Sequence, residues 1–422
     1  MLPKGWVETK LEDFCDVTAG QSPAGHLINK TGEGLPFFQG KAEFGNDYPN
    51  AKNWCSHPPK QAERNDILIS VRAPVGPTNY APETCGIGRG LASVTPLQGI
   101  PSAFLRNALR VIEPELKSKA TGSTFKAITT KVLKNSKVYL PPLAEQRRIV
   151  AKLDSLTPRI ARARAELERV RALQKQWLSK FFDTEFSCDG ELLTLGELAE
   201  DVRYGTAQKC SPDPTLTPVL RIPNIASGKI DTSDLKHSKF TEKEIKKLSL
   251  CIGDLLIVRS NGSVDLVGQS AVADARVSGF LFAGYLIRIR LKNKDITPYF
   301  VHYWLRSSHA RNLINAAAKS TSGVNNINSE QLKNLSIRLP GRLKQREIVS
   351  RITKACSHGN RLETETRHAL ALLDRLESSL LAKAFRGELV PQNPNDEPVS
   401  VLLDRIRAER AAAPQPGRKR KA

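Results

Sequence analysis

The sequence lacks the short motifs with which many enzymes bind nucleotides or metals. It contains no GxxxxGK[ST] phosphate loop, no HExxH zinc motif and no Asn/Asp-Pro-Pro-aromatic tetrapeptide of the adenine methylase type. Its seven cysteines form no CxxC pair and are odd in number, which argues against a disulfide framework and against a cysteine-based metal site. We therefore expect neither a catalytic site nor a metal site in this chain.

Long apolar runs and an excess of aromatic residues are missing as well. Aromatic side chains make up 6% of the chain, and the longest apolar stretch, near residues 280–287, is far too short to span a bilayer. Residues 1–6 lack the apolar core of a signal peptide. These features predict a cytoplasmic protein that has no membrane partner.

Positive charge is what the sequence has in excess. It contains 64 Lys and Arg against 43 Asp and Glu, a formal net charge of +21. Such a chain attracts polyanions, so nucleic acid is the leading candidate partner. The hydrophobic fraction of 40% permits folded cores, and 422 residues are enough for about two to four domains.

A duplication is the strongest internal signal. Residues 121–150 align without a gap to residues 320–349, and 11 of these 30 positions are identical. The offset is too long for a solenoid unit, so it indicates a duplicated domain followed each time by the same connecting segment. A weaker match pairs residues 66–72 with 254–259 across a one-residue gap, so that each strand ends in an arginine at a loop mouth.

The connecting segment is predicted to be helical in both copies. After the prolines, apolar residues recur in alternating steps of four and three, from Ile149 to Phe181 and from Ile348 to Leu380. This spacing is typical of a coiled coil, so the two helices are expected to pair. The alternative is that each helix buries its stripe against its own domain. Pro158 and Gly359 interrupt the two patterns at nearly the same level, which permits a shared kink.

Together these features resemble the specificity (S) subunit of type I restriction-modification systems. One carrier is the run Leu-Pro-Pro-Leu-Ala-Glu-Gln-Arg-Arg-Ile-Val at 140–150, and another is Ala-Phe-Arg-Gly-Glu-Leu-Val at 384–390. The remaining matching segments are residues 2–6, 339–349 and 395–406. The second copy departs from the family pattern at 339–344, as does the first helix at Pro158, which puts methyltransferase docking there in doubt.

The resemblance implies a non-catalytic subunit that reads double-stranded DNA. Each target-recognition domain would bind one half of a bipartite, asymmetric site, and about 38 helical residues would form a spacer on the order of 57 Å. The helices would dock two methyltransferase subunits, which carry adenine N6 methylation, and endonuclease subunits would complete the system. The resemblance places S-adenosylmethionine, ATP and Mg in those partners, with no cofactor bound by this chain.

The expected fold class is α/β (α+β), with two similar target-recognition domains separated by two long helices in an antiparallel, pseudo-twofold coiled coil. The expected divisions are a first domain (1–143), a central helix (144–184), a second domain (185–342), a distal helix (343–387) and a C-terminal segment (388–422). That segment is expected to fold back near the first domain and to end in a basic, solvated tail at 417–421.

Candidate base-reading residues are long polar side chains at predicted loop mouths. Arginine can pair with guanine, and Asn or Gln with adenine, although a phosphate contact or plain solvation is at least as good an interpretation for each. The candidates are Gln39, Lys41, Arg72, Arg89, Lys126, Arg221, Arg259, Asn261, Asn325 and Asn326. The loops at 123–126 and 322–326 are the preferred pair. The glycine-rich run at 86–90 is interpreted as a turn and not as a phosphate loop.

The helices provide a second set of candidates. Apolar positions of the two stripes are expected to hold the helices together, whereas outward polar positions would contact the methyltransferase or cap the first turn. The set is Gln146, Arg147, Ile149, Leu153, Leu167, Trp177, Gln345, Arg346, Ile348, Leu373, Leu376 and Leu380.

Three rival functions stay open. The first is the same subunit serving a methylase without restriction or exchanging with other recognition domains, which a neighbouring endonuclease gene would distinguish. The second is an enzyme that acts alone on nucleic acid, which the missing motifs disfavour. The third is a nonspecific basic scaffold, which would bind DNA without a sequence preference.

Overall fold

The computed structural model describes residues 2–122, 126–321 and 324–412. Ser123, Ser322 and the basic tail at 417–421, all singled out from the sequence, lie outside the described residues. Residues 123–125 and 322–323 of the two preferred recognition loops are therefore not described, and Lys126, Asn325 and Asn326 are the candidate residues of those loops that can be placed.

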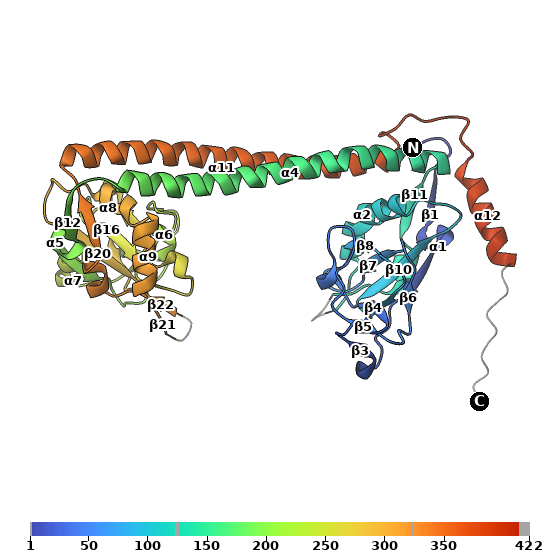
Figure 1. The fold of residues 1–422 in the computed structure, drawn as a ribbon, viewed down its shortest axis with the longest axis horizontal. Helices are drawn as coiled ribbons and strands as arrows, with labels where there is room; N and C mark the ends of the chain where they lie inside the picture. The colour runs from blue at the N-terminus through green and yellow to red at the C-terminus, as the bar shows by residue number, and fades with distance from the viewer. Residues whose placement is uncertain (1, 123–125, 322–323, 413–422) are drawn as a thin grey trace. The chain divides into compact units, whose positions relative to one another are not determined.

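The chain divides into two units (Figure 1). Unit 1 contains residues 1–165 and 369–422, and unit 2 contains residues 166–368. Two long helices, α4 (Leu143–Phe186) and α11 (Arg342–Ala384), each contribute one part to each unit. The chain therefore leaves unit 1 along α4 and returns to it along α11.

Unit 1 is built around a four-stranded antiparallel sheet of order β2-β10-β7-β8. A smaller sheet of order β3-β5-β4-β9-β6 contains the parallel pair β4 and β9, while β1 pairs with β11. The strands are β1 (Val7–Lys10), β2 (Cys15–Ala19), β3 (Ile28–Asn29), β4 (Leu35–Phe38), β5 (Trp54–Cys55), β6 (Gln61–Ala62), β7 (Ile67–Ser70), β8 (Thr78–Tyr80), β9 (Cys85–Ile87), β10 (Leu91–Pro96) and β11 (Lys137–Leu140). The helices are α1 (Leu11–Phe14), α2 (Ser102–Ser118), α3 (Thr130–Lys134) and α12 (Val399–Ala412).

Unit 2 repeats this plan. Its main sheet has the order β13-β20-β16-β18, its parallel pair is β14 and β19, and β12 pairs with β23. The strands are β12 (Glu191–Thr194), β13 (Ala199–Tyr204), β14 (Thr217–Leu220), β15 (Lys236–Ser238), β16 (Leu255–Val258), β17 (Ser260–Asn261), β18 (Ser270–Val272), β19 (Leu281–Phe282), β20 (Leu286–Leu291), β21 (Lys319–Thr321), β22 (Val324–Asn326) and β23 (Ser336–Leu339). The helices are α5 (Leu195–Leu198), α6 (Ile222–Ile225), α7 (Glu242–Leu248), α8 (Pro298–Trp304), α9 (Ser308–Ala317) and α10 (Ser329–Lys333).

The two central strands begin in the same way. The side chain of Asp66 accepts a hydrogen bond from the Glu63 amide (2.9 Å), and Asp254 accepts one from the Cys251 amide (2.8 Å). Each turn leads into a strand whose residues are all buried, β7 or β16. The expected duplication is therefore confirmed in strand order and in the turns that start the core.

The register of these strands corrects one expectation. The amide of Val71 donates to Gly90 O, and the amide of Arg259 donates to Tyr285 O at the matching position, both at 2.9 Å. The carbonyls of Val71 and Arg259 also accept from the equivalent residues Ile128 and Ile327. Arg259 is therefore equivalent to Val71 and not to Arg72, because the assumed one-residue gap does not exist.

The two long helices pair in antiparallel fashion within each unit. In unit 1, Arg164 donates to Asp374 (2.6 Å). In unit 2, Gln174 donates to the Gly359 carbonyl (2.5 Å) and Arg351 to Glu185 (2.7 Å). Residue numbers rise along one helix as they fall along the other, which gives the expected antiparallel coiled coil. α4 continues through Pro158.

The expected strict heptad fails in the second half of each helix. Trp177 is 53% exposed and Leu376 46% exposed, while Leu178 and Glu377 are partly buried. In α11 the protected positions from Ile348 to Ala384 are separated by ten intervals that cover 36 residues. Their mean spacing is therefore that of a straight α-helix. Because such a helix drifts relative to a 3.5-residue repeat, the contact stripe moves away from Trp177 and Leu376.

The outer turns of both helices pack against the domains. Ile149 and Leu153 belong to the apolar core of unit 1, whereas Phe182, Ile348 and Ile352 belong to that of unit 2. The alternative interpretation, in which each helix buries its apolar stripe against its own domain, is thus correct at these turns. α12 also packs into unit 1 through buried Leu402 and other apolar residues, as expected for the C-terminal segment.

Candidate nucleic-acid interface

The candidates of the first domain converge around one cavity of about 260 Å³. Gln39 follows β4, Arg72 follows β7 and Arg89 follows β9. These three side chains line the cavity together with Lys41. They meet because β4 runs parallel to β9 and both chain segments leave the sheet at the same end. Lys126 is exposed and precedes Ala127, which forms a backbone bridge with Arg72.

The cations of this cavity differ in how firmly they are held. Arg89 donates through Nε to the Ser22 hydroxyl (3.0 Å). Among the described residues, Lys41 and Arg72 form no side-chain hydrogen bond or ion pair, and both are exposed. These two side chains are therefore free to contact a ligand without breaking an existing interaction.

The glycine-rich run at 86–90 contains the last two residues of β9 and then turns at 88–90, where Arg89 and Gly90 line this cavity. A Cβ atom at Gly90 would lie 2.2 Å from the Gln39 carbonyl oxygen, and one at Gly88 3.2 Å from the Gln39 Cα. Glycine is needed here so that the segment can pack closely against the end of β4. The interpretation as a turn is confirmed for residues 88–90 but not for residues 86–87, which belong to β9, and this turn sets the position of Gln39 beside Arg89.

Four candidates of the second domain gather where β17 pairs with β22. Asn261 pairs with Asn325 in register, and Asn325 donates to the Gly262 carbonyl (3.1 Å). The guanidinium of Arg259 lies 4.5 Å from the Tyr204 ring centroid, and its Nε donates to the Asn326 side chain (3.3 Å). Arg259 is thus held by a cation–π contact and a hydrogen bond.

Arg221 is held by a different group of residues. Its guanidinium forms an ion pair with Asp234 (2.9 Å) and donates to the Asp234 carbonyl (3.0 Å). Within the described chain, no hydrogen bond joins Arg221 to the cluster around Arg259. It occupies the position after β14 that Gln39 occupies after β4, since Leu220 and Phe38 pair in the same way with their parallel partner strands.

Two of the proposed outward positions on the helices are in fact buried. Gln146 is 0% exposed and Gln345 2% exposed, and each donates through Nε2 to the proline carbonyl just before its helix, at 2.9 and 2.8 Å. Both side chains therefore tie the helix to the proline segment before it, and neither accepts from an amide of its own first turn, as a helix cap would. Their neighbours Arg147 and Arg346 are exposed, as expected.

The two glutamines differ in one contact. The Gln345 Oε1 accepts a hydrogen bond from the Thr297 amide (2.8 Å). The Gln146 Oε1 has no partner in the described chain, because the residue at the equivalent helix start is Pro101, which has no amide hydrogen. The remaining stripe candidates, Leu167, Leu373 and Leu380, are partly buried between the helices.

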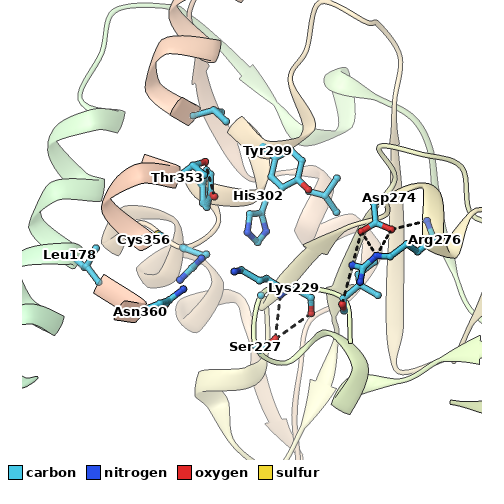
Figure 2. A pocket seen from close by; sticks show the side chains of 16 residues that line it. Leu178, Ser227, Lys229, Asp274, Arg276, Tyr299, His302, Thr353, Cys356 and Asn360 are labelled. Atoms are coloured by element: carbon cyan, nitrogen blue, oxygen red, sulfur yellow. Dashed lines mark hydrogen bonds and ion pairs between the residues drawn. The ribbon is translucent and has the colours of Figure 1, made fainter. Parts of the chain in front are cut away.

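Sequence reasoning missed a group of polar residues beneath α8. His302 is 2% exposed and its Nδ1 shares a hydrogen bond with the Ser270 hydroxyl (2.9 Å). Burial, with a smaller contribution from the charge of Arg306, lowers the pKa of His302 to about 3. This side chain lies in a cleft lined by several cations (Figure 2). A lone histidine in an aromatic helix segment carries no spacing that would have revealed the cleft.

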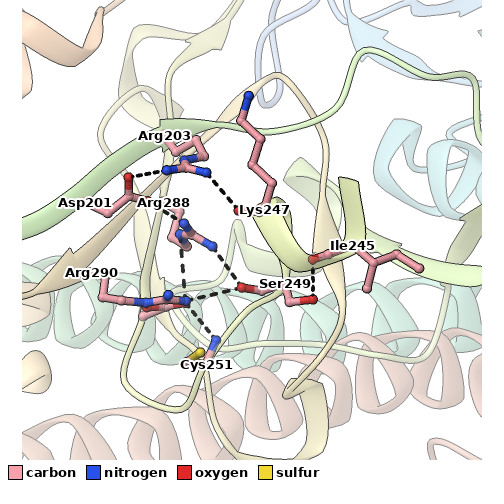
Figure 3. Close-up of polar contacts among 9 residues, drawn as sticks. Asp201, Arg203, Ile245, Lys247, Ser249, Cys251, Arg288 and Arg290 are labelled. Carbon is pink, nitrogen blue, oxygen red and sulfur yellow. Dashed lines mark hydrogen bonds and ion pairs between the residues drawn. The ribbon is translucent and has the colours of Figure 1, made fainter. Parts of the chain in front are cut away.

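Sequence reasoning also missed a buried arginine network on the main sheet of unit 2 (Figure 3). Arg288, 2% exposed, donates to Asp201 and to the Ser249 carbonyl, the latter at 2.8 Å. Arg290 forms two hydrogen bonds with Asp254, at 2.8 and 2.7 Å. These ion pairs lie on β20, and removal of either partner of Arg288 or Asp254 would leave a buried charge uncompensated.

No group of three or more His, Cys, Asp or Glu side chains that could hold a metal ion is found in the described part of the chain. Nor does any helix among the described residues combine the length and apolar character needed to cross a membrane.

Two like domains on a shared helix pair, each with polar side chains gathered where its strands end, define a two-site recognition protein. The family model described as "Type I restriction modification DNA specificity domain" matches residues 3–171 and again residues 190–371. The chain belongs to this family. It is thus a DNA sequence-specificity subunit, the non-catalytic part of a type I restriction-modification system.

Known proteins agree with this assignment. The specificity subunit of the type I restriction enzyme EcoKI from Escherichia coli K12 is 28% identical over 380 residues, covering 82% of each chain. A chain from a structural study of complex assembly and conformational transition of the type I R-M system has a TM-score of 0.76 and 21% identity, covering 92% of this chain and all of that one. The HsdS subunit from Thermoanaerobacter tengcongensis has a TM-score of 0.56 and 21% identity, covering 92% and 98%. The expected fold class is confirmed.

Proposed function

We propose that unit 1 and unit 2 each read one half of a bipartite, asymmetric duplex DNA target. The observation that carries this proposal is that one fold holds different polar side chains at equivalent strand ends. Gln39 stands where unit 2 has Arg221, and Arg72 stands where unit 2 has Ser260. Because glutamine and arginine favour different bases, two such surfaces favour two different half-sites.

Positive charge would position these surfaces on the duplex. The net charge of +21 attracts phosphates in a way that does not depend on sequence. Lys41 and Arg72, which have no partner among the described residues, are suited to this attraction as well as to base contacts. Specificity would come from the smaller number of side chains that reach base edges.

The helices would set the spacer and dock two methyltransferase subunits. Exposed Arg147 and Arg346 in the first turns of α4 and α11 are available for such contacts. S-adenosylmethionine would be bound by the methyltransferase subunits, and ATP and Mg by endonuclease subunits of the complete complex. We place the assembly in the cytoplasm, where chromosomal DNA is accessible.

The adenine methylation map of the host genome tests this function. Native long-read sequencing would compare cells with the gene intact, deleted and restored, with the methyltransferase subunit produced in all three. We expect deletion to remove one interrupted, asymmetric motif and restoration to return it. An unchanged map in the presence of active methyltransferase would contradict the proposal.

A binding measurement separates a specificity subunit from a basic scaffold. The purified complex of this chain with its methyltransferase subunits would be titrated with the mapped motif and with a scrambled duplex. A sequence-reading complex prefers the motif by about 10³-fold or more, whereas a scaffold binds both equally and loses both with added salt.

A further inference from the structure

Unit 2 contains a cleft of about 470 Å³ between α8, α11 and the loop after α6. His302 lies at its centre in Figure 2, with Lys229 and Asn360 directed toward the same space and Asp274 and Arg276 at one side. Arg306, which follows α8, also lines it. The cleft thus gathers three cations from three separate segments of the chain.

The buried histidine has one free nitrogen. Its Nδ1 is used by Ser270, and the Nε2 has no hydrogen-bond partner among the described residues. The backbone at Gly228 adopts a φ of +80°, and a Cβ there would lie 3.6 Å from Arg306 Nη1 and 3.8 Å from His302 Cε1. The guanidinium and the imidazole therefore approach the same point beside Gly228.

The acidic residues near the cleft do not neutralise its cations. Asp274 is the carboxylate that lines the cleft, and it is already bonded to Arg276 (2.7 Å). Arg306 contacts the rings of Phe182 and Tyr303, and in the described chain neither it nor Lys229 has an ion-pair partner. Two positive charges thus remain unbalanced.

The equivalent place in unit 1 shows what is missing. The ring pair Phe104–Phe385 of unit 1 corresponds to Phe300–Phe186 of unit 2, with the same centroid distance of 5.2 Å. Arg110 follows Phe104 by six residues, and Arg306 follows Phe300 by the same distance in sequence. Arg110 forms an ion pair with Glu377 of α11 (2.7 Å).

The helix position equivalent to Glu377 lies in unit 2 on α4. α4 and α11 are related by the offset of 199 residues, so this position is Leu178, and Leu178 lines the cleft beside Arg306. Unit 1 therefore supplies a carboxylate to its arginine, whereas unit 2 has an apolar side chain and an open cleft at the same place.

We propose that the His302 cleft of unit 2 binds the phosphate group of a small organic phosphate. Arg306 and Lys229 would contact the phosphate oxygens, His302 Nε2 would provide one further hydrogen bond, and Tyr299, Tyr303 and Leu178 would pack against the organic part. The proposal is independent of DNA recognition, because the cleft includes none of the residues assigned to base reading.

Cys356 offers a direct readout of occupancy. Cys356 lines the cleft together with Arg306 and Lys229. Burial raises the pKa of its thiol, and the charges of Arg306 and Lys229 both oppose that rise. Alkylation of the full chain by a neutral thiol reagent, followed at the peptide level, reports on Cys356 alone. We expect inorganic phosphate or AMP to slow alkylation of Cys356 and adenosine to leave it unchanged.

Three variants make the test specific. Arg306→Leu should weaken phosphate binding, measured by calorimetry, by about tenfold or more, since a charge-assisted hydrogen bond is lost. Leu178→Glu should abolish phosphate binding, because it supplies Arg306 with a carboxylate like the one that Glu377 supplies to Arg110 in unit 1. Lys243→Ala, which removes an exposed cation of α7 outside the cleft, is the matched control and should bind as the unaltered chain does.

Three results would overturn the proposal. The first is no binding of phosphate or AMP to the full chain, and the second is equal weakening by Arg306→Leu and Lys243→Ala. The third is protection of Cys356 by an unrelated DNA duplex but not by AMP, which would make the cleft a contact for backbone phosphates. A methylation map that is unchanged by Leu178→Glu would leave DNA recognition intact and separate the two functions.

Discussion

Arg72 and Arg259 occupy successive positions just beyond the ends of the equivalent strands β7 and β16, and this difference of one residue decides how freely each can act. Arg72 extends from the strand end without a partner among the described residues, and it lines the first cavity. Arg259 stacks on Tyr204 and bonds to Asn326. The two arginines are thus not equivalent: one is free at a cavity, whereas the other is held by an aromatic ring and an amide.

The first prediction is that Arg72→Ala impairs the reading of one half-site only. Loss of a bidentate contact to a base should cost about 1–3 kcal/mol on the motif, while a duplex scrambled in that half-site binds as before. Fluorescence anisotropy on the two duplexes gives both values. Arg64→Ala is the control, as Arg64 is exposed and outside the cavity. Equal loss on both duplexes would instead make Arg72 a phosphate contact.

The second prediction concerns acid stability. The pKa of His302 is about 3 in the folded chain and near 6.5 when unfolded, so the unfolded chain binds the proton first. Stability is therefore complete above about pH 6.5 and falls as the pH drops toward 3, by at most about 1.4 kcal/mol per pH unit from this group. Urea unfolding at pH 7.5 and 5.0 should show a smaller difference for His302→Gln. The same difference in both proteins would refute this assignment.

At the scale of elements, the helix pair follows the geometry of a straight helix more closely than a strict heptad. A heptad read from the sequence correctly places the first half of each stripe, from Ile149 and from Ile348, because drift is small over a few turns. It fails at Trp177, where the accumulated rotation turns the ring toward solvent, stacked on Phe181 at 5.1 Å.

The third prediction compares two substitutions in this pair. Ile352→Ala removes a fully buried side chain and should reduce the free energy of unfolding by about 2–5 kcal/mol. Trp177→Ala removes a larger but half-exposed side chain and should cost less than about 1 kcal/mol. Chemical denaturation of the purified chain measures both. A larger loss of unfolding free energy for Trp177→Ala than for Ile352→Ala would show that Trp177 packs between the two helices.

Sequence reasoning succeeded where the duplicated residues have a structural task. Leu133 and Leu332 are fully buried, and Gln146 and Gln345 tie the helix starts to the preceding prolines, so both pairs are kept in the two copies. Loop-mouth candidates in the first domain were found because strand ends predict where side chains gather. The His302 cleft could not be found in this way, since its members come from distant segments with no common spacing.

At the scale of the whole molecule, each unit consists of one domain and parts of both helices. The chain passes between the units through α4 and α11 alone among the described elements. A change of helix length between the outer turns, which pack into the domain cores, therefore changes the connection without altering either domain. This property makes the spacer testable independently of the half-sites.

The fourth prediction is that shortening both helices shortens the spacer. Deleting residues 163–169 and 368–374, whose ends face each other through the Arg164–Asp374 pair, removes about 10 Å of helix. That length corresponds to about three base pairs of duplex. The methylation map should show the same half-sites with a spacer reduced by about that amount. Altered half-sites with an unchanged spacer would contradict the role of the helices.

The acidic residue at one strand position is neutralised differently in the two units. Asp16 on β2 forms an ion pair with Arg410 of α12 (2.7 Å), near the far end of the chain. Asp201, at the equivalent position of β13, is bonded by Arg203 (2.8 Å) and Arg288 of its own sheet. In the second domain, the cations that pair with this aspartate thus belong to the same continuous segment. In the first domain, the cation comes from a helix that is distant in the sequence. Recombination between genes of this family can therefore transfer the second domain as a single cassette, while a transplanted first domain must bring its α12, whose buried Leu402, Leu403 and Ile406 complete the core of unit 1.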